Sequence, residues 1–241
     1  MPGYGYGIAE VLTSNPASGG GAPPFEYTAI DNNYSMTFDG TNYIQISKGQ
    51  SLGITNSISI SVWARFPLNY NGGANPRSAY IISEDIVGGT GRNFSLRFQG
   101  GSTPKNITFE FWNTDGTQNT LNAPSSSLID NQWHHIVATY DGTTNADGIN
   151  VYIDTVKTSA TAASTGIRST SNVGTLIGAT RESSPIYKVS GNLDELAVWD
   201  GNVLSEDTIE KIYNTTNDNP GKVADLSETP EGAPLAWYRF E

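Results

Sequence analysis

Apolar and polar residues alternate with a period of two over much of this chain. In the run 57–66, isoleucine, valine, alanine and phenylalanine occupy the even positions, and serine, tryptophan and arginine occupy the odd ones. Such alternation is typical of strands that bury one face. The pattern predicts strands over residues 34–38, 43–46, 58–66, 94–99, 107–112, 133–140, 149–154, 175–178 and 193–199. Because Gly, Asn and Asp turns join them, we expect antiparallel sheets packed face to face.

One segment near the C-terminus has helical rather than strand periodicity. Ser205 is a good N-cap, and two acidic residues follow it where the helix dipole favours negative charge. Ile209, Ile212 and Tyr213 recur on one face. The sequence therefore predicts one short helix that packs on the sandwich and ends in the polar run from Asn214 to Gly221.

The composition divides the chain into three parts. Residues 1–30 are rich in Gly and Pro and read as a linker, either a flexible tail or an arm that attaches to other proteins. Residues 31–219 hold the strand pattern and form the predicted sandwich. Residues 220–241 read as an acidic linker and a terminal strand. That strand either opens a second, truncated module or folds back beside the closing strand, and the second is favoured because an unpaired apolar strand is an aggregation liability.

Several segments resemble the laminin-G-like jelly rolls of the concanavalin A-like superfamily. The most specific is the run 132–142, with the sequence QWHHIVATYDG, and the runs 34–46, 58–64, 149–154, 175–179 and 191–199 follow the family pattern in order. The resemblance implies an all-β jelly roll of two antiparallel sheets. It also implies binding of sugars or proteins, often with a structural calcium ion, although some relatives in the superfamily are glycoside hydrolases.

The resemblance also points to a calcium site. Asp194 matches the family position whose carboxylate often holds the cation, and Asp39, in a Phe-Asp-Gly turn, is the candidate second ligand. Oxygen-rich loops suit Ca²⁺, but Asp39 can equally support its own turn and Asp194 can cap a loop.

Paired carboxylates, which retaining glycosidases require about 5–5.5 Å apart, are not evident in the sequence. The neighbouring acids Glu84-Asp85 and Asp194-Glu195 are expected to face opposite sides of their strands, and Glu110 stands alone. His134 and His135, the only histidines, are adjacent and cannot share a site on a strand, so structural packing is the better interpretation. The chain has no cysteine. The sequence therefore favours a non-enzymatic module.

Five side chains lie on the polar faces of predicted strands and could bind a ligand: Trp63, Arg65, Arg97, Glu110 and Trp112. If their strands are neighbours, they form one polar and aromatic stripe suited to a glycan or a protein. The alternative is an Arg97–Glu110 pair across two strands, beside tryptophans that loops cover.

The net charge of −11 disfavours nucleic acid as a partner, and no apolar run is long enough to span a membrane. The N-terminus lacks the features of a signal peptide. The composition also resembles that of laminin-G-like structural proteins of tailed phages, which assemble in the cytoplasm and need no signal peptide. The resemblance implies a virion surface protein of the capsid or tail, attached to other virion proteins through its N-terminal arm, or an otherwise extracellular module. The alternatives are a carbohydrate-binding module of a secreted bacterial protein and a purely structural capsid decoration protein. Homo-oligomers are compatible with each.

Overall fold

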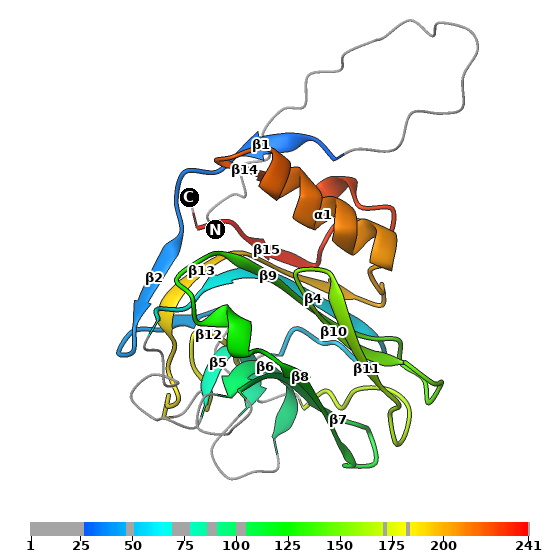
Figure 1. Ribbon diagram of the computed structural model, residues 1–241. Helices are drawn as coiled ribbons and strands as arrows, with labels where there is room; N and C mark the ends of the chain where they lie inside the picture. Colours follow the sequence, from blue (N-terminus) through cyan, green and yellow to red (C-terminus); the bar gives the residue numbers. More distant parts are fainter. Residues whose placement is uncertain are drawn as a thin grey trace, which may run out of the picture.

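The structure is a computed structural model that describes residues 27–46, 51–68, 78–85, 91–99, 105–170, 173–181 and 184–240. Two antiparallel sheets pack face to face, and a further layer covers the outer side of one of them (Figure 1). The predicted all-β sandwich is confirmed. None of the helices in these ranges could span a lipid bilayer.

The larger sheet has seven strands in the order β11-β10-β9-β4-β13-β15, with β2 also paired to β13. Its strands are β2 (Met36–Asp39), β4 (Ile58–Arg65), β9 (His134–Tyr140), β10 (Ile149–Ile153), β11 (Val156–Ala160), β13 (Ser190–Asp200) and β15 (Ala236–Tyr238). The smaller sheet has the order β3-β12-β5-β6-β7-β8. Its strands are β3 (Ile44–Gln45), β5 (Ala79–Asp85), β6 (Arg92–Gln99), β7 (Asn106–Trp112), β8 (Gln118–Pro124) and β12 (Thr175–Ile177).

The main core fills the space between the sheets, as the alternation predicts. The even positions of β4 and the residue after it are fully buried there: Ile58, Ile60, Val62, Ala64 and Phe66. Aromatic and aliphatic side chains of β6 and β7 meet them from the other sheet: Phe94, Leu96, Phe98, Ile107, Phe109 and Phe111. Full burial of each large side chain contributes about 1.5–3 kcal/mol, so this core holds the two sheets together.

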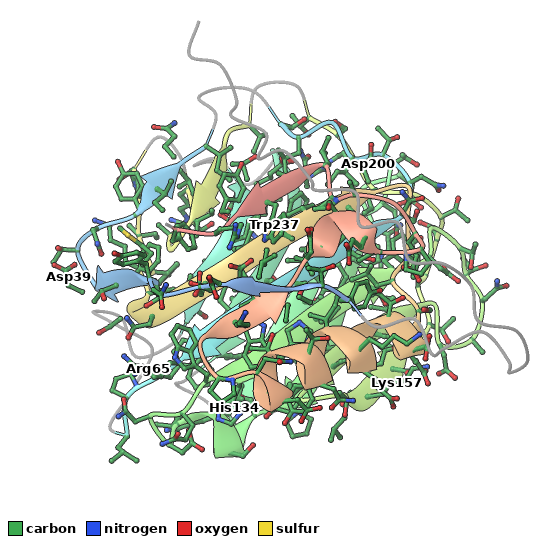
Figure 2. All side chains as sticks on the ribbon, turned by 90° about the horizontal axis from the view of Figure 1, so that it is seen from above. Asp39, Arg65, His134, Lys157, Asp200 and Trp237 are labelled. Atoms are coloured by element: carbon green, nitrogen blue, oxygen red, sulfur yellow. The ribbon has the colours of Figure 1, made fainter. Side chains whose placement is uncertain are left out.

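An outer layer covers the other face of the seven-stranded sheet. It consists of α1 (Glu206–Asp218), β1 (Ala29–Asp31), β14 (Lys222–Ala224) and the short 3₁₀ helix η2 (Leu226–Glu228). Figure 2 looks down on this layer and shows α1 and β1 crossing over the strands of the sheet. A second apolar core lies beneath it, where Ile209 and Ile212 of α1 pack with Trp199 of β13.

Both ends of the described chain belong to this architecture. β1 pairs with β14, and Tyr27 is only 4% exposed, so the predicted arm over residues 1–30 extends too far: residues 27–30 are part of the fold. Residues 1–26 lie outside the described residues. β15 pairs antiparallel with β13, with Tyr238 opposite Leu196, which is the fold-back arrangement. The helix begins after Ser205, as predicted, and continues to Asp218.

Candidate functional site

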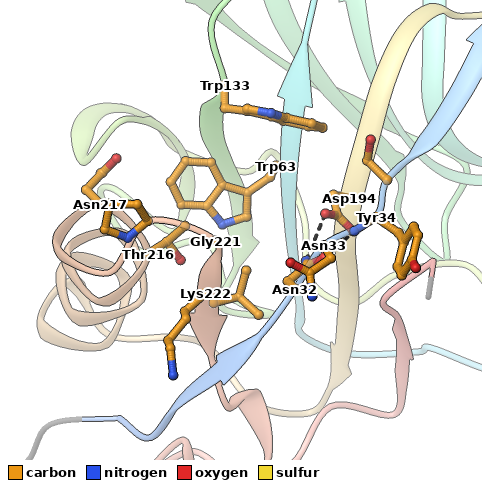
Figure 3. Close-up of a pocket in the computed structure, with 13 residues that line it drawn as sticks. Asn32, Asn33, Tyr34, Trp63, Trp133, Asp194, Thr216, Asn217, Gly221 and Lys222 are labelled. Carbon is orange, nitrogen blue, oxygen red and sulfur yellow. Dashed lines mark hydrogen bonds between the residues drawn. The ribbon is translucent and has the colours of Figure 1, made fainter.

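A pocket of about 430 Å³ lies where the outer layer meets the seven-stranded sheet (Figure 3). We call it the interlayer pocket. Its volume lies within the range of about 300–1,000 Å³ that small-molecule sites occupy. The residues that line it are Asn32, Asn33, Tyr34, Ser35, Trp63, Trp133, Asp194, Thr216, Asn217, Pro220, Gly221, Lys222 and Val223.

Trp63 of β4 forms part of the floor. Its ring packs nearly parallel to His135 and Tyr213, with centroids 5.0 and 5.9 Å away, and the residue is 5% exposed. Figure 3 shows the indole nitrogen on the edge that faces into the pocket. In the part of the chain that the structure describes, nothing accepts a hydrogen bond from this N–H. The pocket therefore contains a fixed donor that a ligand can use.

Trp133, which precedes β9, adds a second indole. It is half-buried, and the guanidinium of Arg65 lies 5.4 Å from its ring centroid. Arg65 is itself held by Asn192, to whose Oδ1 its Nη2 donates over 3.1 Å. In Figure 3, Trp133 and Lys222 lie at opposite ends of the pocket. The ring of Trp133 is thus an aromatic surface held in place by the cation of Arg65, and it lies near the indole N–H of Trp63.

The polar wall comes from the segment between β1 and β2 and from β13. Asn32 Nδ2 donates to Asp194 Oδ2 over 2.9 Å, and Asn32 Oδ1 accepts from the backbone N–H of Tyr34 over 3.2 Å. Asn33 and Tyr34 are exposed beside them. Across the pocket, Lys222 is paired with Asp31 at 3.4 Å, with both side chains well exposed, so that ion pair adds little stability.

A β-bulge places two carboxylates behind this wall. Asp194 lies opposite Trp63 and Ala197 lies opposite Ser61, so β13 has one residue more than β4 in between. Glu195 adopts a φ of 50° in the bulge. Leu193 and Leu196 on either side point into the main core, and the two acids between them both point outward. The prediction that adjacent acids face opposite ways is wrong here, because a bulge breaks the alternation.

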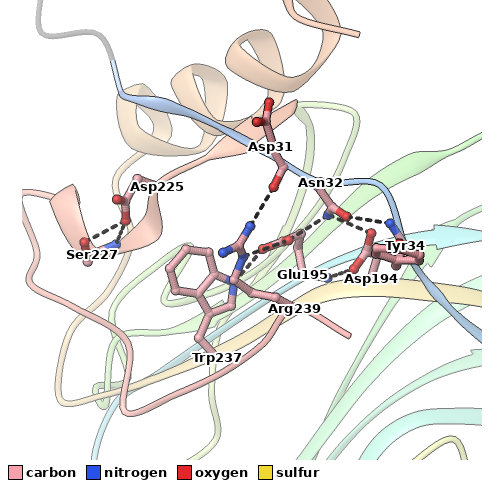
Figure 4. Close-up of polar contacts among 9 residues, drawn as sticks. All are labelled: Asp31, Asn32, Tyr34, Asp194, Glu195, Asp225, Ser227, Trp237 and Arg239. Atoms are coloured by element: carbon pink, nitrogen blue, oxygen red, sulfur yellow. Dashed lines mark hydrogen bonds and ion pairs between the residues drawn. The ribbon is translucent and has the colours of Figure 1, made fainter. Parts of the chain in front are cut away.

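Glu195 is enclosed beneath the outer layer (Figure 4). Its Oε1 accepts from Asn32 Nδ2 over 2.7 Å and its Oε2 from the indole N–H of Trp237 over 2.6 Å, while Arg239 Nε lies 3.5 Å from Oε1. Burial, and then the charge of Asp194, raises the pKa of Glu195 to about 8, against the lowering effect of Trp237 and Arg239. The residue is 3% exposed and does not line the interlayer pocket. A glycosidase needs both carboxylates against the scissile bond, and only Asp194 meets the pocket.

Comparison with known proteins agrees with this architecture. Residues 38–210 match the laminin G family model described as the concanavalin A-like lectin/glucanases superfamily. The chain belongs to this superfamily. No protein with a curated function matches the sequence.

Solved structures with the same fold come from several kinds of protein. Domain 4 of AbnA, a GH43 extracellular arabinanase from Geobacillus stearothermophilus solved with arabinotriose, is 16% identical, with a TM-score of 0.50 over 76% of this chain and 79% of that one. The binding domain of Paraclostridial Mosquitocidal Protein 1 is 15% identical, with a TM-score of 0.57 over 79% of this chain and 46% of that one. Mouse laminin alpha1 LG4-5 is 13% identical, with a TM-score of 0.49 over 71% and 41%. The chain thus spans less than half of the last two structures, and these likenesses show the fold alone.

The five predicted ligand-binding residues do not form one stripe. Trp63 and Arg65 belong to the seven-stranded sheet, whereas Arg97, Glu110 and Trp112 belong to the six-stranded sheet. The sheets pack face to face, so their outer surfaces look in opposite directions. The sequence shows which side of a strand is polar, but it does not show which strands are neighbours. Trp63 lines the interlayer pocket. Arg65 does not line it, but its guanidinium packs against the ring of Trp133, which does.

The three residues on the other surface already have partners: Arg97 pairs with Glu110, and Trp112 packs against Arg92. Arg97 Nη2 and Glu110 Oε1 form an ion pair at 2.5 Å with side chains only 13% and 10% exposed, and Arg97 Nη1 donates to Ser78. The guanidinium of Arg92 lies 5.5 Å from the ring of Trp112. The cavity beside them is about 10 Å³, roughly enough for one water. This is the cross-strand pair that the sequence offered as the alternative.

The two predicted calcium ligands cannot share an ion. Asp39 lies opposite Ser190 on β13, four residues before Asp194, a separation of about 13 Å at roughly 3.3 Å per residue. Figure 2 shows Asp39 at the edge of the molecule. Its Oδ1 accepts from Thr41 and from the backbone N–H of Asn42, which lowers its pKa. Among the described residues, no group of three or more Asp, Glu, His or Cys side chains could hold a metal ion. Calcium binding by Asp194 without Asp39 stays a prediction of the resemblance.

The two histidines point to opposite faces, as predicted. His135 is buried on the outer face, where its Nε2 lies 2.8 Å from Ser61 Oγ, and burial lowers its pKa to about 4. His134 lies between Asp154 and Asp130, 2.5 and 3.0 Å from its ring nitrogens, and the hydrogen bond to Asp154 raises its pKa. Each imidazole is engaged in packing or ion pairing.

Proposed function

We propose that this chain is a non-enzymatic recognition module that binds a neutral glycan in the interlayer pocket. One observation carries the proposal: the unused indole N–H of Trp63 points into a pocket that also contains a second indole, the Asn33 amide and the Asp194 carboxylate. Sugars combine apolar C–H faces with hydroxyl groups that both donate and accept hydrogen bonds. Aromatic rings beside a few fixed polar groups suit that chemistry.

The charges around the pocket favour a neutral ligand. Lys222 is the cation among the lining residues, and it is paired with Asp31. Asp194 adds a negative charge to the wall, and the whole chain carries −11. An acidic sugar would enter against this field, so a glycan without carboxylate or sulfate groups is the better match.

The comparisons support a binding role. A domain of the arabinanase AbnA with the same fold was solved with arabinotriose, and the mosquitocidal protein relative is a binding domain. Glu195 is enclosed behind Asn32, so the carboxylate pair offers a substrate no second reactive group. Together these points favour binding over hydrolysis.

A glycan array followed by calorimetry tests the proposal. Trp133→Ala is expected to weaken binding by about 30-fold or more, the effect of losing a central aromatic contact worth at least ~2 kcal/mol. Trp112→Ala is the matched control, because it removes the same side chain from the opposite surface. Binding that survives Trp133→Ala, or that falls equally with Trp112→Ala, would show that the ligand binds elsewhere.

We also propose that the module acts on a virion surface. The acidic chain without cysteines supports this setting, and the Gly- and Pro-rich residues 1–26 supply an attachment segment. Proteomics of purified particles separates this proposal from the alternative of a secreted bacterial protein. A capsid decoration protein, the other alternative, would be found in particles and would bind no glycan on the array.

A further inference from the structure

Asn32 joins the pocket wall to a buried acid. Its single Nδ2 atom donates to both Asp194 Oδ2, at 2.9 Å, and Glu195 Oε1, at 2.7 Å (Figure 4). Asn32 and Asp194 line the interlayer pocket, and Glu195 lies behind them. Two carboxyl groups that share one amide nitrogen are too close for both to carry a charge at low cost.

Apart from Asn32, Trp237 and Arg239, which contact the carboxyl group directly, the groups packed around Glu195 carry no charge. The groups of the sheet and outer layer that pack against it with Trp63 are neutral: Ser61, Ile212, Val223, Ala224 and Leu226. His135, which is bonded to Ser61, is neutral above pH 5. The cation that contacts Glu195 is Arg239, and its Nη2 donates to the backbone carbonyl of Asp31.

A neutral Glu195 resolves this conflict. The protonated acid can accept from Asn32 and Trp237 while leaving Asp194 as the charged partner of the same amide. Lys222 and the Asp31 carboxylate, the charged groups of β14 and β1, pair with each other at the surface. The bulge that turns Glu195 to this side holds a non-glycine residue at positive φ, a costly conformation that the surrounding contacts maintain.

We infer that Glu195 is a positioning residue for the interlayer pocket: as a neutral acid it lets Asn32 bridge it to Asp194 and fix the pocket wall, and its ionisation releases that wall. Ligand binding is then pH-dependent through a residue that the ligand does not touch. The inference rests on the proposed function for its consequence, but the state of the wall can be measured without a ligand.

Hydrogen exchange of the backbone amides of residues 32–35 measures the wall directly. Protection factors, corrected for intrinsic exchange, are compared between the wild type and Glu195→Gln from pH 6 to 9. We expect protection in the wild type to fall about tenfold across pH 8, and protection in Glu195→Gln to stay constant. Asp194→Asn removes the like charge and should move the wild-type transition to lower pH. Equal profiles for the wild type and Glu195→Gln, or an unmoved transition in Asp194→Asn, would overturn the inference.

Repeating the glycan array at pH 6 and pH 9 separates the two proposals. Binding by the wild type that weakens at pH 9, with constant binding by Glu195→Gln, supports both. Glycan binding with no pH difference between the two proteins leaves the proposed function standing and rejects the role of Glu195. If no glycan binds at either pH while the exchange transition is present, the proposed function fails and the positioning role survives.

Discussion

Replacing Glu195 with Gln should change how the free energy of unfolding depends on pH. In the folded protein the pKa of Glu195 is about 8, against an ordinary value of 4.5. Between these values the unfolded chain has lost the proton and the folded chain keeps it, so stability falls as pH rises through this window and levels off above pH 8. Each tenfold difference in proton affinity is worth about 1.4 kcal/mol, so the ceiling is about 5 kcal/mol for this 3% exposed residue.

Glutamine cannot ionise, so the free energy of unfolding of Glu195→Gln should lack this pH-dependent contribution. The amide presents one oxygen where Asn32 and Trp237 now donate to two, so the variant loses a hydrogen bond at every pH. That loss lowers the free energy of unfolding by the same amount at every pH. The reasoning is therefore tested by how the difference between the two proteins changes with pH. Burial also raises the pKa of Glu84, but Glu84 is present in both proteins and cancels in the difference.

Urea denaturation followed by tryptophan fluorescence at pH 5, 6, 7, 8 and 9 measures both curves. The difference between Glu195→Gln and wild type should move in favour of the variant by at most about 4 kcal/mol from pH 5 to pH 8, which is three pH units at about 1.4 kcal/mol each, and should flatten by pH 9. A difference that does not change with pH would refute the reasoning, because Glu195 would then have the same proton affinity folded and unfolded.

Three further predictions concern other parts of the fold. By NMR, the His135 ring should titrate near pH 4 and the His134 ring above its ordinary value; titration of both rings near 6.5 would contradict this. Truncation after Pro234 removes β15, and should lower the melting temperature and expose β13 to proteases; unchanged melting would show that this edge needs no cover. Glu110→Ala leaves Arg97 buried without its partner and should cost about 3–5 kcal/mol in denaturation experiments, with glycan binding retained; a loss of binding would move the ligand to the smaller sheet.

Period-two patterning predicted the strands that bury one apolar face, and it missed others for physical reasons. β5 is buried on both sides and carries a bulge between Tyr80 and Ile82, so its sequence does not alternate. β8 buries its alternate positions, but Asn119 is one of them, and its exposed positions are Gln, Thr, Asn and Pro. Neither run resembles a half-buried strand.

The sequence did not predict the outer layer, because a polar strand face can be buried when its hydrogen bonds are satisfied. Ser59 donates to the carbonyl of Asn202 and accepts from the backbone N–H of Leu204, and Ser61 pairs with His135. In the sequence, these serines look like residues that face water. The helix and its apolar stripe were predictable, but their place over β4 was not. The bulge at Glu195 contains no glycine that would indicate it in the sequence. The placement of Asp194 and Glu195 on the same face could therefore not be predicted either.

The interlayer pocket owes its floor and its walls to different parts of the chain. Trp63, Trp133 and Asp194 lie inside the region 38–210 that matches the superfamily. The lining residues of the segments 32–35 and 216–223 lie outside it, as do Trp237 and Arg239, which hold Glu195. The region that matches the superfamily therefore contains the sandwich, both indoles and Asp194, and the other wall segments of the pocket lie outside it. Because β1 and β14 must pair before those wall segments come together, the proposed function implies that ligand specificity depends on segments outside the shared sandwich.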